Sequence, residues 1–330
     1  QREDPTFAKA VDERSERRLQ SSSMTLNQGF TYREKLGADA TGANLLEYLI
    51  THYRHSSEVE WQARIDAGRV RLNGSPAEQE TLLRAGQTLT WHRPPWHEPE
   101  APTSFAIVFL DTHLLAVAKP RGLPMMPGGG YLNRTLLYLV QSRFPEATPL
   151  HRLGRGTSGL ALFARSDAAR SSMTSAWQKG RIRRFYRASV RGRFEPSDLE
   201  IQVPIGPVFH PVLGKVHAAC ETGKPSRTRV HLLEARDKTS VVEVEIETGR
   251  PHQIRIHLAA AGFPLDGDPL YPKGGVPSPE TTALPGDPGY HLHAERLSFN
   301  HPETKARVNI ECAPPAILRR RNQKPVGSRQ

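Results

Sequence analysis

Cysteine is scarce in this chain of 330 residues, which contains only Cys220 and Cys312. A disulfide framework needs several cysteines and a structural zinc site typically uses closely spaced pairs, so neither is indicated. Long apolar runs are also missing: no segment approaches the roughly 20 apolar residues of a membrane-spanning helix, and no signal-peptide pattern is visible. We therefore expect a soluble, cytoplasmic protein.

Acidic residues are outnumbered. The chain has 34 Asp and Glu against 45 Lys and Arg, which gives a formal net charge of +11. Such an excess suits a polyanionic partner such as nucleic acid, although a solvated basic surface would give the same total. Charge alone leaves these two interpretations open.

The N-terminal part predicts a lead-in followed by a small module. Residues 1–28 are polar and charged with little apolar periodicity, and we expect them to be disordered. In residues 42–91, one helix is indicated by apolar residues at helical spacing from Leu45, and a second helix ends near Gly68. A strand entering the Asn-Gly turn at 73–74 and a closing strand complete this unit.

A proline-rich linker at residues 92–103 separates this module from a larger domain, predicted at 104–314. Apolar strand runs in the larger domain occur in adjacent pairs rather than in strict βαβ alternation, which favours an α+β fold with a mainly antiparallel mixed sheet. The predicted strands are 105–110, 114–118, 160–164 and 241–246, and the predicted helices are 133–143 and 167–179. The basic tail, 315–330, is expected to be disordered.

The most informative segment is PLHRLGRGTSGLALFARS, residues 149–166, a basic loop set between two apolar runs. It carries a histidine, two arginines and three glycines within nine residues: His151, Arg152, Arg155, Gly154, Gly156 and Gly159. Glycine in a paired strand costs backbone entropy, so this composition favours a catalytic or anion-binding loop.

This loop resembles the HRLD-x-x-TSG signature of RluA-type RNA pseudouridine synthases, with Gly154 at the position of the family's catalytic aspartate. Five further segments resemble family motifs in the family order. They are KPRGLP at 119–124, RFYRA at 184–188, KPSRT at 224–228, TGRPHQIRIH at 248–257 and GDPLY at 267–271. Residues 42–91 resemble the small RNA-binding module that many of these synthases share with a ribosomal small-subunit protein.

The resemblance implies a monomer that isomerises uridine to pseudouridine in structured, ribosomal RNA without a metal or cofactor. Positive charge develops at the sugar carbon during this reaction, and a nearby carboxylate stabilises it. Gly154 offers no such group. The alternative is therefore a catalytically silent RNA-binding protein or ribosome-assembly factor.

The resemblance also assigns roles to single residues. Tyr186 would stack on the target uracil, and Arg152 would fill the gap left by the flipped nucleotide. As alternatives, Tyr186 could be a core aromatic and Arg152 a surface residue. Arg64, Arg69 and Arg71 would contact phosphate in the small module, unless that module is merely structural, and Lys119 would either contact phosphate or end a strand. Thr157 and Ser158 would organise a turn.

Arg255 is the best match to the arginine that pairs with the family aspartate. A buried arginine without a carboxylate costs about 3–5 kcal/mol, so we expect compensation by another acid, by water or by RNA phosphate. Asp266, Asp268 and Glu295 lie in suitable segments. The candidate metal ligands, His252, His257, His291 and His293, lack a cysteine or carboxylate that completes a set, so no metal is expected.

Overall fold

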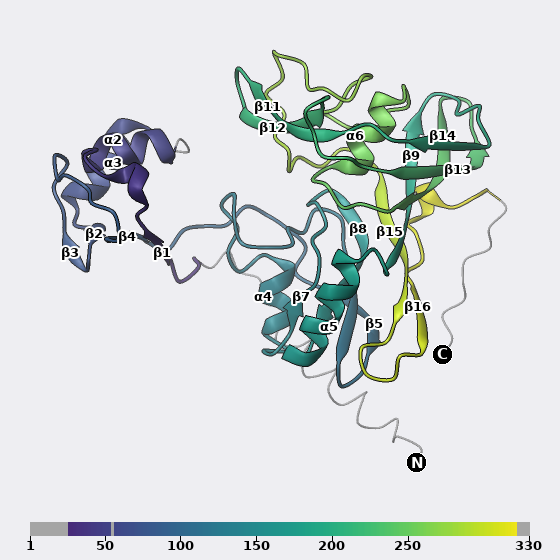
Figure 1. Cartoon of the computed structure of the whole chain (residues 1–330), viewed down its shortest axis with the longest axis horizontal. Helices are drawn as coiled ribbons and strands as arrows, with labels where there is room; N and C mark the ends of the chain where they lie inside the picture. Colours follow the sequence, from purple (N-terminus) through teal and green to yellow (C-terminus); the bar gives the residue numbers. More distant parts are fainter. Residues whose placement is uncertain (1–25, 54–55, 322–330) are drawn as a thin grey trace. The chain divides into compact units, whose positions relative to one another are not determined.

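The computed structural model describes residues 26–53 and 56–321 (Figure 1). The chain divides into two compact units, Gln1–Glu98 and Pro99–Gln330. The predicted lead-in lies outside the described residues except for 26–28. Within the described ranges, no helix is long and apolar enough to cross a bilayer.

The first unit packs two helices on a four-stranded sheet with strand order β1-β4-β2-β3. Its elements are β1 (Phe30–Lys35), the 3₁₀ helix η1 (Ala38–Ala40), α2 (Leu45–His52), α3 (Glu58–Asp66), β2 (Val70–Leu72), β3 (Ser75–Pro76) and β4 (Thr88–Arg93). The predicted helices and the hairpin are therefore present. Strand β1 was not predicted, because the module was expected to begin only at residue 42.

Local signals explain the helix starts and the hairpin of this unit. The Asn44 side chain accepts a hydrogen bond from the backbone N–H of Glu47 (2.8 Å), and Ser57 forms a reciprocal capping box with Glu60. Asn73 and Gly74 have φ angles of +51° and +89°, as a two-residue hairpin turn requires. The predicted linker overlaps this unit, which extends to Glu98. Within it, the backbone N–H of Trp96 donates to the Asn27 side chain (3.1 Å).

The second unit is built on a ten-stranded sheet, with strand order β10-β13-β14-β9-β15-β8-β6-β5, β16 added beside β15, and β7 beside β8. Its strands are β5 (Ala106–Leu110), β6 (Leu114–Lys119), β7 (Thr148–Pro149), β8 (Thr157–Ala164), β9 (Arg183–Arg191), β10 (Asp198–Ile201), β13 (Thr228–Ala235), β14 (Thr239–Ile246), β15 (Leu292–Asn300) and β16 (Arg307–Glu311). A separate hairpin joins β11 (Ile205–His210) and β12 (Gly214–Ala219). Among the strands that the structure describes, β8 with β15 is the one parallel pairing, so the expected α+β class and mainly antiparallel sheet are confirmed.

Three α-helices accompany this sheet: α4 (Leu136–Gln141), α5 (Asp167–Gln178) and α6 (Gln253–Ala260). The first two confirm the predicted helices, although α4 is shorter than expected. Helix α6 was not predicted. Gln253 through Ala259 are all buried, so this helix shows no polar face and no amphipathic periodicity.

The parallel contact between β8 and β15 corrects one expectation about the signature loop. Thr157, Ser158 and Gly159 are the first residues of β8 rather than a turn, and Gly159 pairs with Ala294. A Cβ at Gly159, whose φ is +103°, would lie 2.2 Å from the carbonyl oxygen of Ala294. Glycine is therefore required for this close approach, which brings the signature loop beside the start of β15.

The predicted disordered tail is folded in its first residues. The 3₁₀ helix η2 (Ala316–Leu318) buries Leu318, and Arg321 pairs with Glu234 (3.4 Å). Residues 322–330 lie outside the described residues.

Candidate active site and RNA-binding surface

A cavity of about 660 Å³ lies in the second unit, where several of the motif segments meet. The signature loop contributes Arg152 and Gly154, strand β9 contributes Tyr186, and helix α6 contributes Arg255. Residues about 100 positions apart in the chain are thus gathered at one site. Sequence reasoning had named all four.

Within the loop, Arg152 is exposed and His151 is not a catalytic candidate. The Nε2 atom of His151 accepts the backbone N–H of Leu162 (3.0 Å), and its ring stacks on Trp177. Burial and the neighbouring Arg184 lower the pKa of His151 to about 3, so the ring is neutral. His151 therefore anchors the loop to β8, while Arg152 stays accessible to a ligand.

The prediction that Lys119 contacts phosphate is not supported by its position. Its side chain is 1% exposed, and its ammonium donates to the carbonyl oxygens of Leu123 (2.6 Å), Pro120 (3.0 Å) and Arg155 (3.3 Å). Burial lowers the pKa of Lys119 to about 7. Its role is to hold the corner after β6 against the signature loop, which matches the strand-end alternative.

Tyr186 lies in the middle of β9, between Val244 of β14 and Ala294 of β15, and lines the cavity. Burial raises the pKa of its phenol, which is therefore protonated at neutral pH. Arg184, two residues earlier on the same face, also lines the cavity and donates to the carbonyl of Glu247 (2.8 Å). Burial lowers the pKa of Arg184, and sequence reasoning had given this residue no role.

Arg255 has the carboxylate partner that its burial demands. Its Nε and Nη2 donate to the two carboxylate oxygens of Asp268 at 2.7 and 2.8 Å, and the side chains are only 3% and 1% exposed. Burial disfavours the charged guanidinium, but the bonds to Asp268 outweigh it and raise the pKa of Arg255. Of the three acids proposed, Asp268 thus supplies the compensation, whereas Glu295 pairs with Arg187 (2.6 Å).

Asp268 does not offer its carboxylate to the cavity. Its Oδ1 atom also accepts the backbone N–H groups of Leu270 (2.9 Å) and Tyr271 (3.2 Å), and its Oδ2 atom accepts from Arg255 Nε, so both oxygens have partners. Among the residues that the structure describes, no Asp or Glu lines the cavity. The cavity therefore combines cations and aromatic rings without a carboxylate at its surface.

Besides Arg184, sequence reasoning missed His252, which it weighed only as a metal ligand, and Tyr290 as residues of the cavity. Tyr271 donates its hydroxyl to the carbonyl of His217 (2.8 Å), so His252 Nδ1, 2.8 Å from the same hydroxyl oxygen, must carry a proton and donate. Burial and Arg255 lower the pKa of His252 to about 4. Its Nε2 is thus an acceptor that a bound base can use.

Tyr290 is 2% exposed and packs against Arg255, whose Cζ atom lies 4.4 Å from the ring centroid. Its position just before β15 lies outside every motif that sequence reasoning had used. Gly154 and Gly156 of the signature loop lie against the Tyr290 side chain because β8 pairs with β15, and the sequence alone does not reveal this contact.

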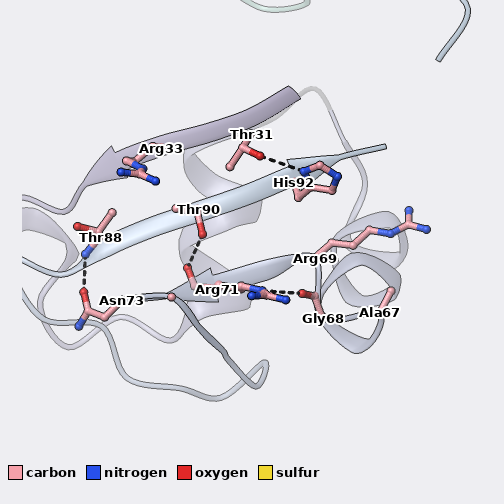
Figure 2. A pocket seen from close by; sticks show the side chains of 11 residues that line it. Thr31, Arg33, Ala67, Gly68, Arg69, Arg71, Asn73, Thr88, Thr90 and His92 are labelled. Carbon is pink, nitrogen blue, oxygen red and sulfur yellow. Dashed lines mark hydrogen bonds between the residues drawn. The ribbon is translucent and has the colours of Figure 1, made fainter. Parts of the chain in front are cut away.

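The first unit has a basic groove of about 900 Å³ on its sheet (Figure 2). Arg33 of β1, Arg69 and Arg71 are exposed and line it together with His92, and within the described residues no acidic side chain does. Arg69 and Arg71 were predicted here. Arg33 was missed, because β1 was not recognised.

Arg64 is not part of this groove. Its guanidinium donates to the Ser56 hydroxyl (2.7 Å) and lies over the rings of Trp61 and Trp91, at 4.6 and 4.8 Å from their centroids. Arg64 therefore ties α3 to β4. The structure assigns it a packing role in place of the predicted phosphate contact.

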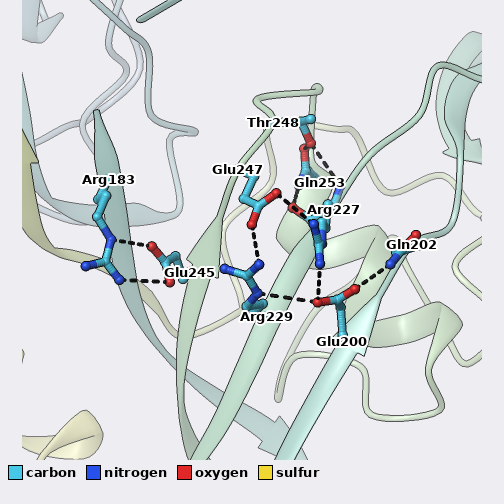
Figure 3. Close-up of polar contacts among 9 residues, drawn as sticks. All are labelled: Arg183, Glu200, Gln202, Arg227, Arg229, Glu245, Glu247, Thr248 and Gln253. Carbon is cyan, nitrogen blue, oxygen red and sulfur yellow. Dashed lines mark hydrogen bonds and ion pairs between the residues drawn. The ribbon is translucent and has the colours of Figure 1, made fainter. Parts of the chain in front are cut away.

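Exposed arginines on the large sheet differ from those in the groove, because glutamates neutralise them (Figure 3). Arg227 bonds Glu200 and Arg229 bonds Glu247, both at 2.7 Å, and Arg183 bonds Glu245 at 2.8 Å. Hydrogen bonds from Arg227 are the main reason that the pKa of Glu200 falls to about 2. This face contributes little positive potential for an RNA backbone.

Potential metal ligands do not gather in the described part of the chain: no group of three or more His, Cys, Asp or Glu side chains could hold an ion there.

The fold has a counterpart among solved structures. The human protein named RNA pseudouridylate synthase domain containing 1 is 27% identical and superposes with a TM-score of 0.52, covering 66% of this chain and 86% of that chain. The family profile described as RNA pseudouridylate synthase matches residues 113–260, which include the signature loop and the whole TGRPHQIRIH segment.

Two curated relatives extend the similarity to nearly their whole length. An uncharacterised RNA pseudouridine synthase of Synechocystis is 40% identical over 83% of this chain and 95% of its own. Ribosomal large subunit pseudouridine synthase D of Neisseria meningitidis is 32% identical over 89% of this chain and 81% of its own. This chain belongs to the RNA pseudouridine synthase family.

Proposed function

We propose that this protein isomerises uridine to pseudouridine in structured RNA, with ribosomal RNA as the substrate class. The observation that carries the proposal is the single cavity in which Arg152, Tyr186 and Arg255 meet from three separate segments. The name of the Neisseria relative, a ribosomal large subunit enzyme, supports the choice of ribosomal RNA.

The chemistry of the cavity suits a flipped uridine. The Tyr186 ring provides a stacking surface, a contact that contributes about 1–3 kcal/mol per base. The exposed Arg152 is free to enter the stack that the uridine leaves. The neutral His252 offers an acceptor at Nε2, which suits the imide N–H of uracil.

The basic groove supplies affinity in this proposal. Arg33, Arg69 and Arg71 are exposed and face no acid in the groove, so they can exchange their counterions for RNA phosphates. Phosphate contacts carry little sequence information, so target choice belongs to the cavity.

A second candidate function is a catalytically silent RNA-binding or ribosome-assembly factor. It is favoured by Gly154 and by the absence of a carboxylate among the described residues that line the cavity. Both candidates predict RNA binding that weakens steeply with salt, and only the first predicts a modified product.

Two measurements test these functions. Ribosomal RNA transcripts are incubated with the full chain, and pseudouridine is detected by chemical labelling and primer extension. Binding is measured separately between 50 and 300 mM salt. A pseudouridine at a defined position supports the synthase; salt-dependent binding without product supports the silent factor; no binding at low salt contradicts both.

A further inference from the structure

The Tyr290 side chain fills the space that a side chain at position 154 would need. A Cβ placed on Gly154 would lie 2.9 Å from the hydroxyl oxygen of Tyr290, closer than side-chain carbons approach such atoms. Gly154 does not adopt a positive φ, so its backbone would accept an aspartate. The obstacle is therefore the Tyr290 hydroxyl, which stands where the side chain of the family aspartate would begin.

A side chain at Gly156 would also collide with the ring of Tyr290. Its Cβ would lie 2.8 Å from Cζ of Tyr290 and 3.0 Å from Cε1. Two glycines of the signature loop thus make room for one phenol. Tyr290 is 2% exposed and has little freedom to move away, so the loop and the ring fit only as a pair.

The surroundings of the Tyr290 hydroxyl suit a phenolate. The guanidinium of Arg255 lies over the ring with Cζ 4.4 Å from its centroid, and positive charge at this position stabilises a negative ring. Thr157 Oγ1 lies 3.4 Å from the hydroxyl oxygen and can donate to it when the phenol ionises.

We propose that Tyr290 is the nucleophile of this site and replaces the aspartate that Gly154 lacks. This inference rests on the proposed synthase function. Phenol oxygen is an established nucleophile in enzymes that break bonds at a sugar carbon, where it serves in place of a carboxylate. Tyr290 lines the same cavity as Tyr186 and Arg255, in which the target nucleotide would bind.

The reaction balances without another reactant. The phenol oxygen of Tyr290 forms a bond to C1′ of the ribose as the C1′–N1 bond breaks, and the phenolic proton passes to the departing uracil. After the base rotates, its C5 attacks C1′ and the bond to Tyr290 breaks, returning the electron pair to the phenol oxygen. The proton from C5 restores the phenol, and the product is an isomer of the substrate.

The first test replaces Tyr290 by phenylalanine, which keeps the ring and removes only the hydroxyl. Single-turnover pseudouridine formation should fall by on the order of 10⁴-fold, while RNA affinity and the melting temperature stay near those of the unaltered chain. The matched control is Tyr138→Phe on α4, whose side chain is exposed and outside the cavity. Modification by Tyr290→Phe within tenfold of the unaltered chain would overturn the proposal.

The double variant Gly154→Asp with Tyr290→Phe tests the shared space. Removing the hydroxyl vacates the position that an aspartate needs, so the double variant should modify RNA at least tenfold faster than Tyr290→Phe alone. A double variant no faster than Tyr290→Phe would show that the phenol does not stand in for the aspartate.

A pH profile separates a nucleophile from a positioning residue. Site-specific replacement of Tyr290 by 3-fluorotyrosine lowers the phenol pKa, so the rising limb of the single-turnover rate should move to lower pH. An unmoved limb would assign Tyr290 a structural role. If the unaltered chain binds RNA but forms no pseudouridine, the proposed function itself fails, and this result is distinct from an active Tyr290→Phe variant.

Discussion

The groove of the first unit and the cavity of the second unit both depend on arginine, but they use it in opposite ways. Arg69 and Arg71 of the groove are exposed, and no acid faces them there. Arg255 of the cavity is 3% exposed and bonded to both oxygens of Asp268. In water, arginine offers distributed, salt-sensitive attraction, whereas in the interior it must be paired and then fixes geometry. In the proposed function, the groove therefore supplies RNA affinity and the cavity supplies the chemistry.

Removing the carboxylate of the buried pair should give the largest effect. In Asp268→Asn the guanidinium of Arg255 loses its counter-charge in the interior, and the free energy of unfolding should fall by about 3–5 kcal/mol. Urea unfolding of the full chain measures it. The control Asp167→Asn breaks the exposed pair with Arg170 and should change stability by less than about 1 kcal/mol. Equal effects from the two variants would refute the contrast.

Removal of the Tyr186 ring should act on one nucleotide. Tyr186→Ala loses a stacking contact of about 1–3 kcal/mol, so modification of the target uridine should slow by roughly 10- to 100-fold. Overall RNA affinity should stay nearly constant, because phosphate contacts are distributed elsewhere. Tyr186→Phe keeps the ring and serves as the control in single-turnover assays. If Tyr186→Ala lost affinity for unrelated RNAs as strongly as it lost modification rate, the proposed assignment of affinity to the groove and of uridine recognition to the cavity would be wrong.

Neutralising two groove arginines should lower overall RNA affinity rather than engagement of one nucleotide. In the double variant Arg69→Gln with Arg71→Gln, RNA affinity should weaken across unrelated sequences. The plot of the logarithm of the binding constant against the logarithm of salt concentration should become shallower, its slope losing about 1.4–1.8 in magnitude. Arg227→Gln with Arg229→Gln is the matched control, because those exposed arginines are already paired with Glu200 and Glu247. If the control changes the slope as much as the groove variant, RNA does not favour the groove.

Lys119 should have the smallest effect on RNA. Lys119→Met should leave the salt dependence of RNA binding unchanged, because the ammonium is 1% exposed and bonded to backbone carbonyls. Filter binding over a salt series checks this expectation. A reduced slope in this variant would restore the phosphate contact predicted from the sequence.

Lys119 should instead appear in the pH dependence of stability. Its pKa of about 7 in the folded chain lies below its ordinary value, so above pH 7 the unfolded chain binds more protons than the folded one. Stability should therefore rise with pH from about 7 to 9, by up to about 2 kcal/mol from this group. Lys119→Met should flatten that rise in urea titrations. A rise of the same size in both proteins would assign it to other groups.

Much of the fold was predictable because its signals are local. Apolar spacing indicated α2, the glycine at residue 68 marked the end of α3, the Asn-Gly turn marked the hairpin, and paired apolar runs indicated the antiparallel sheet. Helix α6 escaped prediction because its buried residues have no polar face. Strand β1 was missed because five of its six residues, Phe30 to Arg33 and Lys35, are exposed, so it lacks the buried alternation of a typical strand.

Sequence by itself determined the family, two arginines of the groove, Arg69 and Arg71, and three cavity residues, Arg152, Tyr186 and Arg255, because each lies in a contiguous motif or segment. Only the tertiary structure decided which charges are accessible: Lys119 is buried and holds the signature loop, and Arg64 lies over the rings of Trp61 and Trp91 and ties α3 to β4. The tertiary structure also places Asp268 beside Arg255 as its ion-pair partner. The contact between Gly154 and Tyr290 joins residues 136 positions apart through the pairing of β8 with β15, and no local pattern encodes such a distance.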